Sequence, residues 1–169
     1  MSGMTVKSFE PIVDDRTKVL ILGTMPSQIS LAQGQYYANP RNAFWRIIHG
    51  LLGGNPEAGY AERTAFLLER RIGLWDVLAD CRREGSSDAS IRDPVPNDFP
   101  RLFARYPAIE AGFFNVSKAE ILFRRLVLDK VPLKDGLVFQ RLPSTSPAHA
   151  IPFEKKLEAW KAIVNVINR

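Results

Sequence analysis

The sequence predicts an α/β fold, a three-layer αβα sandwich whose central sheet has four strands and is mostly parallel. Short apolar runs alternate along the chain with segments of helical periodicity, which is typical of a parallel sheet covered by helices on both faces. The length of 169 residues, with 46% hydrophobic and 24% charged residues, fits one ordinary globular domain. We therefore expect residues 1–169 to form a single domain with its own core.

Four segments have the composition of strands. The first ends at Gly23, the third ends at Asn115, and the fourth is stopped by Pro143. Short apolar runs of this kind are typical of strands that are buried on both faces. The predicted strands, of which the second is a strand or a strand-like segment, are residues 18–23, 73–78, 111–115 and 137–142.

Five segments have the pattern of helices. In the first, one face carries apolar side chains at helical spacing, namely Phe44, Ile47, Ile48 and Leu51. A similar apolar stripe runs along the last segment. The predicted helices are residues 42–52, 61–70, 100–106, 118–127 and 153–168.

Positive charge is concentrated in the C-terminal part of the chain. Residues 1–100 carry 11 Lys and Arg against 12 Asp and Glu, a net charge of −1. Residues 101–169 carry 12 against 6, a net charge of +6. Such an excess favours a polyanionic partner, although a basic solvated surface explains the charge equally well.

The cysteine and histidine content argues against several cofactors. Cys81 is the one cysteine, so the chain cannot form an internal disulfide or supply four thiolates to an iron–sulfur cluster. We expect this thiol to be packed as a small residue. His49 and His149 are too few for the usual three-ligand zinc site, and we expect no metal and no cofactor.

The sequence contains no membrane segment and no secretory signal. A run of about 18 apolar residues, which a spanning helix needs, is absent. Residues 1–15 lack a basic region followed by an apolar one. We therefore expect a cytoplasmic protein with no membrane partner.

Ligands of open α/β sheets bind beyond the carboxyl ends of the strands, so the loops at these ends are candidate sites. The first loop begins at Gly23, which lets the backbone approach a ligand closely. Further along, Tyr36 and Tyr37 offer flat faces on which a nucleobase could stack. Packing is the alternative for the tyrosines, and capping of a helix is the alternative for Asn42.

The other two candidate loops begin at Asn115 and at residue 142. Asn115 has a donor and an acceptor that suit the edge of a base, while a turn residue that satisfies local backbone is an equally good explanation. Ser144, Thr145 and Ser146 lie among prolines in a stiff loop of small residues, which can press closely on a sugar–phosphate chain. A plain connection into the last helix is the alternative.

These loops carry a family resemblance. The stretches Gly-Thr-Met-Pro-Ser at 23–27 and Tyr-Ala-Asn-Pro-Arg-Asn-Ala-Phe-Trp at 37–45 resemble the first motif of the mismatch-specific uracil-DNA and thymine-DNA glycosylases. Leu-Pro-Ser-Thr-Ser-Pro-Ala at 142–148 resembles the second motif of the uracil-DNA glycosylase superfamily. Together they are similar to the motifs of the hypoxanthine-DNA glycosylase branch, and the resemblance implies the superfamily's fold.

The chain departs from the uracil-specific branches at several positions. Met25 stands where they have an Asn or Asp that holds the attacking water, and Leu142 stands where they have a His that stabilises the departing base. Asn39 replaces the His that precedes a proline in the first motif. The resemblance to the hypoxanthine branch assigns the catalytic role to Asn42 instead.

The resemblance implies a monofunctional DNA glycosylase of base-excision repair, which flips a deaminated base, hypoxanthine in particular, out of DNA and hydrolyses its N-glycosidic bond. The base would stack on Tyr37 or Tyr36, with Phe44 or Trp45 as support. Asn115 and backbone groups near Met25 would read its edge, and Asn42 would position water. The other substrate-binding residues implied are Gly23, Thr24, Met25, Pro26, Ser27 and Asn39. The DNA-binding residues implied are Ser144, Thr145, Ser146, Pro147, Ala148 and His149.

Three other functions stay open at this point. A uracil or G:U/G:T mismatch glycosylase is one, although Met25 argues against it. A catalytically weak protein that binds DNA lesions would fit the missing motif residues. An unrelated small-molecule enzyme is disfavoured by the positive C-terminal part and by the lack of a Gly-rich nucleotide motif. We expect the protein to act on DNA as a monomer.

Overall fold

The computed structural model describes residues 4–169, and its central sheet is the one that the sequence predicts. All neighbouring strands in this sheet are parallel, which confirms the predicted α/β class. In spatial order the strands are β3 (Ile72–Asp76), β2 (Val19–Gly23), β6 (Ala111–Phe114) and β7 (Val138–Arg141). The carboxyl ends of all four therefore lie along one edge.

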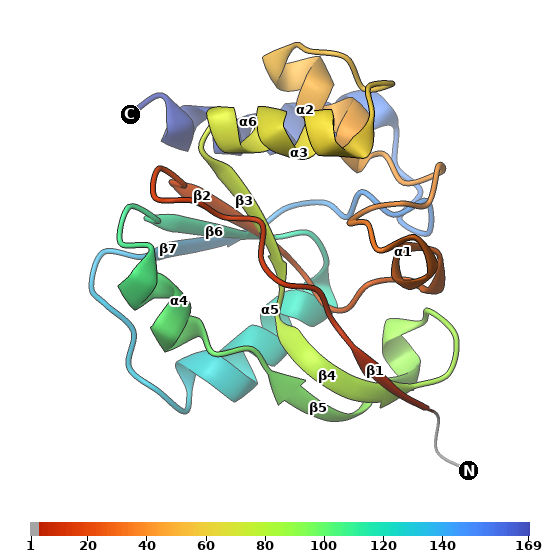
Figure 1. Ribbon diagram of the computed structural model, residues 1–169, viewed down its shortest axis with the longest axis vertical. Helices are drawn as coiled ribbons and strands as arrows, with labels where there is room; N and C mark the ends of the chain where they lie inside the picture. Colours follow the sequence, from red (N-terminus) through yellow and green to blue (C-terminus); the bar gives the residue numbers. More distant parts are fainter. Residues whose placement is uncertain (1–3) are drawn as a thin grey trace.

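Helices cover both faces of the central sheet (Figure 1). Along β2, Val19 and Ile21 point to one face and Leu20 and Leu22 point to the other, so each face has its own hydrophobic core. The first face is covered by α2 (Phe44–Leu52), α3 (Tyr60–Glu69) and α6 (Phe153–Ile167). The second face is covered by α4 (Phe99–Arg105) and α5 (Ser117–Phe123).

A second, smaller sheet was not predicted from the sequence. It is antiparallel and has the order β1 (Met4–Lys7), β4 (Leu78–Arg83), β5 (Arg92–Pro96). Only Val77 separates β3 from β4, so the chain passes directly from the central sheet into the small one. The single strand predicted at 73–78 is therefore wrong at its end, because the chain turns into a new strand there.

The helix boundaries differ from the predicted ones for local reasons. The first predicted helix begins at Phe44 rather than Asn42, because Ala43 is its N-cap and the Asn42 Oδ1 accepts the N–H of Phe44 from outside the helix. Residues 118–127 contain α5 followed by a π-helical turn, Arg124–Leu128. Two short helical segments lie outside the predicted set, α1 (Gln28–Gln33) and the 3₁₀ turn Asp88–Ser90.

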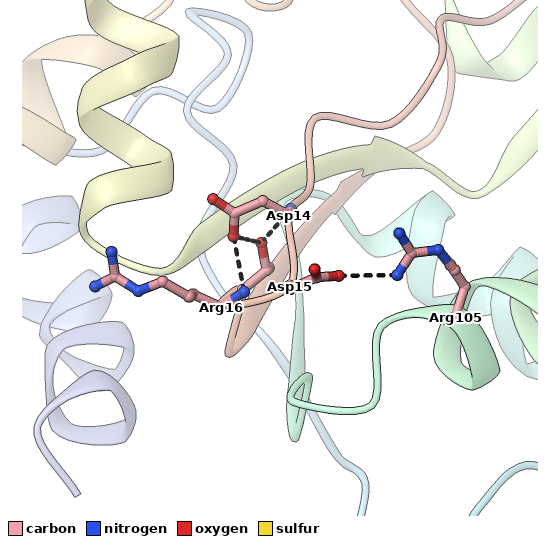
Figure 2. Close-up of polar contacts among 5 residues, drawn as sticks. Asp14, Asp15, Arg16 and Arg105 are labelled. Carbon is pink, nitrogen blue, oxygen red and sulfur yellow. Dashed lines mark hydrogen bonds and ion pairs between the residues drawn. The ribbon is translucent and has the colours of Figure 1, made fainter.

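The amino ends of the strands form the opposite edge of the sheet, where charged side chains lie in solvent (Figure 2). Asp14 accepts a hydrogen bond from the backbone N–H of Arg16 at 2.9 Å. Arg105 forms an ion pair with Asp15 at 2.8 Å, and both side chains are exposed. Exposed pairs of this kind stabilise a fold by less than about 1 kcal/mol. No helix among residues 4–169 is long and apolar enough to cross a membrane.

Candidate active site

A cavity of about 1140 Å³ opens at the carboxyl edge of the central sheet. Its volume exceeds the roughly 300–1,000 Å³ of typical small-molecule sites, so a nucleotide-sized ligand fits within it. Every predicted site residue except Phe44 and Trp45 lines this cavity, namely Gly23, Thr24, Met25, Pro26, Ser27, Tyr36, Tyr37, Asn39, Asn42, Asn115, Ser144, Thr145, Ser146, Pro147, Ala148 and His149. The structure thus brings together residues that lie up to 126 positions apart, from 23 to 149.

Tyr37 presents an aromatic ring to the cavity. Its backbone is left-handed, with φ of 55°, a conformation that is uncommon for a residue with a bulky side chain. The ring stacks on Phe44, with centroids 4.0 Å apart and an interplanar angle of 19°. Phe44 is 0% exposed and does not line the cavity, so it supports Tyr37 from behind.

Tyr36 is built into the core more firmly than its neighbour. Its hydroxyl donates a hydrogen bond to the backbone oxygen of Glu10 at 2.8 Å, and its ring packs edge-on against Phe9. Burial raises the pKa of both Tyr36 and Tyr37, so both phenols are neutral at physiological pH. Of the two predicted stacking rings, Tyr37 is therefore the one whose position suits a ligand.

Asn42 is half-buried and lines the cavity, and its side chain also binds the first N–H of α2. Its Oδ1 accepts the backbone N–H of Phe44 at 2.9 Å. A carbonyl oxygen has two lone pairs, so Oδ1 retains one for a water molecule. The capping and the functional explanations of Asn42 are therefore compatible, since one side chain can serve both.

Asn115 is paired with Thr145 through both ends of its amide. Its Nδ2 donates to the Thr145 Oγ1 at 2.9 Å, and its Oδ1 accepts the Thr145 backbone N–H at 2.8 Å. The two residues are 4% and 1% exposed. The pairing uses one N–H and one oxygen lone pair of the amide, so Asn115 keeps a second donor and a second acceptor. That Asn115 reads a base and that Thr145 contacts DNA stay predictions.

The loop after β7 is fixed from several directions. Besides the Asn115 pairing, it receives hydrogen bonds from the Ala43 backbone N–H to the Thr145 oxygen at 2.9 Å, from Lys156 Nζ to the Ser146 oxygen at 3.1 Å, and from Trp160 Nε1 to the Pro143 oxygen at 2.9 Å. Burial lowers the pKa of Lys156, and Arg46 adds to this effect. The rim of the loop, at Ala148 and His149, is exposed. A rigid loop of this kind can hold a phosphate chain without losing much conformational entropy.

Asp76, the last residue of β3, is a cavity residue that the sequence analysis did not find. It is 5% exposed, and its Oδ2 has no hydrogen-bond partner among residues 4–169. Burial raises the pKa of this carboxyl to about 7, the negative charge of Asp88 raises it further, and the positive charge of Arg83 opposes both. The signal available in the sequence was an acidic residue at the end of an apolar strand.

The turn after β4 supports the first loop and was also missed. The Thr24 hydroxyl donates to Asp88 Oδ2 at 3.2 Å, and Arg83 Nη2 donates to the Pro26 oxygen at 2.6 Å. Ser86, Ser87 and Asp88 complete this wall of the cavity. Among residues 4–169, no group of three or more His, Cys, Asp or Glu side chains is arranged to hold a metal ion.

The sequence matches the family model of the Uracil DNA glycosylase superfamily over residues 10–166, which is most of the chain. The chain belongs to this superfamily. The match confirms the resemblance that its two motifs predicted, and it includes all the cavity-lining residues that these motifs contribute.

Similar proteins within the superfamily point to two named specificities. A protein of Methanosarcina acetivorans named hypoxanthine DNA glycosylase is 35% identical over 163 residues, which cover 95% of this chain and 98% of that protein. A hypoxanthine DNA glycosylase of Methanosarcina barkeri is 36% identical over 117 residues, covering 69% of this chain and 74% of that protein. A G/U mismatch-specific uracil DNA glycosylase of Schizosaccharomyces pombe is 27% identical over 169 residues, covering 89% of this chain and 50% of that protein.

A solved structure shares the fold. The solution NMR structure of a Methanosarcina acetivorans protein, described as a candidate uracil DNA glycosylase, matches with a TM-score of 0.81 and 34% sequence identity. The match covers 98% of this chain and 100% of that one. The predicted uracil-DNA glycosylase-like fold is thereby confirmed.

Proposed function

We propose that this superfamily member is a monofunctional DNA glycosylase of base-excision repair that hydrolyses the N-glycosidic bond of a deaminated base, with hypoxanthine preferred. The proposal rests mainly on one observation: the ring of Tyr37, the amide of Asn42 and the fixed loop of residues 144–149 line the same cavity. The two relatives named hypoxanthine DNA glycosylase support the choice of base.

The cavity suits a nucleotide that has left the duplex. Extrusion costs a few kcal/mol of unstacking, and least for a base that is already mispaired. Stacking on Tyr37 stabilises the extruded base by roughly 1–3 kcal/mol, which offsets part of this cost. Ser144 and Ser146 then hold the flanking phosphates, while Ala148 and His149 on the exposed rim face the gap in the duplex. The net charge of +6 in residues 101–169 favours the same polyanionic partner.

Asn42 positions the water that attacks the sugar. Its amide is not a base at neutral pH, so its contribution is orientation rather than proton abstraction. The bond from the Phe44 N–H fixes the rotamer of Asn42, which keeps the second lone pair of Oδ1 in one direction. An oxocarbenium-like sugar is reactive enough to be attacked by a water that is merely well placed.

The test is a panel of duplexes that carry hypoxanthine, uracil, xanthine or ethenoadenine, with abasic sites as the readout. We expect release of hypoxanthine to be fastest. Faster release of uracil from G:U pairs would favour the second specificity, which the Schizosaccharomyces pombe relative suggests. Tight lesion binding with no abasic sites on any duplex would refute the enzymatic proposal and leave a lesion-binding protein.

The role of Asn42 is tested separately with two variants. Asn42→Ala removes both the acceptor for the Phe44 N–H and the water site, whereas Asn42→Ser keeps an oxygen near the helix start that is too short to reach the same water. We expect both to lose at least about 100-fold in single-turnover excision. Asn42→Ala should also lose about 1 kcal/mol of stability. An Asn42→Ala enzyme with the wild-type rate would refute this role while leaving the activity intact.

The organisation as a single domain, the monomeric state and the cytoplasmic location stay predictions. Size-exclusion chromatography with light scattering, with and without a lesion duplex, tests the monomer. A DNA substrate requires that the protein reach the chromosome, and this is a further reason for the predicted location.

A further inference from the structure

Asp76 lines the cavity, and its carboxyl lies near the hydroxyl of Tyr37. Asp76 is paired in register with Gly23 across β2 and β3. A Cβ atom at Gly23 would lie 2.6 Å from Asp76 Oδ1 and 3.7 Å from the Tyr37 hydroxyl. The missing side chain at Gly23 thus makes room for the carboxyl, next to the face on which the extruded base is proposed to stack.

Asp76 lines the cavity, and its carboxyl keeps hydrogen-bonding capacity that the protein does not use. Its Oδ2 is buried and has no partner among residues 4–169, although buried polar atoms are nearly always paired. The amide of Asn115, the neighbouring polar group on the floor, is already bonded to Thr145. Asp76 differs from the amides of Asn42 and Asn115 because a protonated carboxyl can give up its proton to a departing base.

We propose that Asp76 is the general acid of the reaction and gives its proton to the base as the base departs. This inference rests on the proposed glycosylase function. The bond between C1′ of the sugar and the base nitrogen breaks, its electron pair stays on the base, and the Asp76 proton moves onto an oxygen or ring nitrogen of the base. Water then adds to C1′ and releases a proton to solvent, and Asp76 takes up a proton from solvent after the base leaves.

The site needs an acid at this place, because negative charge develops on the leaving base. Leu142 offers no donor where uracil-specific members have a His, and the thioether of Met25 is only a weak acceptor. His149 lies on the exposed rim, and Asp88 already accepts the hydroxyl of Thr24. Asp76 is the buried acid that remains on the cavity floor.

The surroundings of Asp76 keep it protonated up to neutral pH. Burial raises its pKa to about 7, and the nearby charges are Asp88, which raises it, and Arg83, which lowers it. Tyr36 and Tyr37 face the same carboxyl, and burial raises the pKa of both, so they stay neutral. A neutral acid also avoids the repulsion that a carboxylate would exert on an anionic leaving group.

The decisive experiment is the pH dependence of single-turnover excision from a hypoxanthine duplex. Above pH 7 the protonated fraction of Asp76 falls tenfold per pH unit, so the wild-type rate should fall about 100-fold by pH 9. Asp76→Asn keeps the shape but has no acidic proton, and we expect it to be at least about 100-fold slower at pH 6. Its rate should also be independent of pH between 6 and 9.

Two further variants make the result interpretable. Asp15→Asn makes the same chemical change on an exposed residue at the opposite edge of the sheet, and it should keep the wild-type rate and profile (Figure 2). Asp88→Asn removes the neighbouring negative charge but retains an acceptor for Thr24, and it should move the falling limb of the wild-type profile to lower pH. This second variant tests Asp76 even where Asp76→Asn does not fold.

The outcomes separate this inference from the proposed function. A wild-type enzyme that releases no base refutes the function. A wild-type enzyme that releases hypoxanthine, together with an Asp76→Asn variant that is folded and equally fast at pH 6, refutes the role of Asp76. A falling limb that persists in Asp76→Asn, or that stays in place in Asp88→Asn, refutes it as well. Melting curves and affinity for a duplex with an abasic site show whether each variant is folded.

Discussion

Replacing Asn115 by Ala should loosen the loop after β7, because this one amide makes two buried hydrogen bonds to Thr145. A buried hydrogen bond contributes about 1 kcal/mol net, and a partner left unpaired in the interior costs about 1–3 kcal/mol. The change leaves both the backbone N–H and the Oγ1 of Thr145, a residue that is 1% exposed, without this partner. We therefore expect a loss of about 3 kcal/mol, which for a chain of this length lowers the melting temperature by about 6–12 °C.

Urea unfolding followed by circular dichroism measures this loss. Asn55→Ala is the matched control, because Asn55 is exposed and its Oδ1 accepts one local N–H from Glu57 at 2.9 Å. It should cost less than about 1 kcal/mol. Affinity for abasic-site DNA should fall in Asn115→Ala and not in the control. A loss below 1 kcal/mol in Asn115→Ala would show that the pairing with Thr145 does not hold the loop.

Three more predictions concern the cavity. Gly23→Ala places a Cβ 2.6 Å from Asp76 Oδ1, so the carboxyl must move. Single-turnover excision should therefore fall at least about tenfold. A variant with the wild-type rate would contradict this geometry. Tyr37→Leu removes the stacking ring and should lower kcat/KM by roughly 5–150-fold, whereas Tyr37→Phe should keep most of it. Asp76 has a folded pKa of about 7 against about 3.9 when unfolded, so the free energy of unfolding should fall as pH rises from 4 to 7. Asp76→Asn should abolish this slope and be more stable than wild type at pH 8, which urea unfolding at several pH values checks.

The central sheet was predictable because its strands are short, uninterrupted apolar runs. Strands buried on both faces must be apolar throughout, as in Val19–Gly23 and Ala111–Phe114. The small sheet was not predictable, because β4 mixes apolar and charged residues and its pairing with β1 joins residues about 75 positions apart along the chain. Local sequence says little about such distant pairings.

The residues of the site likewise divide into those that the sequence predicts and those that it does not. The motif loops identified the walls of the cavity, since their resemblance covers contiguous stretches around Tyr37, Asn42 and Ser144. The pairing of Asn115 with Thr145 depends on the distance between two loops, and no local pattern encodes it. Asp76 gains its raised pKa from burial and from Asp88, which are both properties of the folded chain.

The support that α6 gives to the loop after β7 bears on how the enzyme is made. Lys156 and Trp160 reach up from this helix to the backbone of the loop, so the loop acquires its fixed shape after the helix has formed. On the ribosome the chain emerges from its N-terminus, so residues 153–167 appear after the loop that they support. A nascent chain therefore carries the residues of the first loop and of the loop after β7 before it carries the helix that fixes the loop after β7.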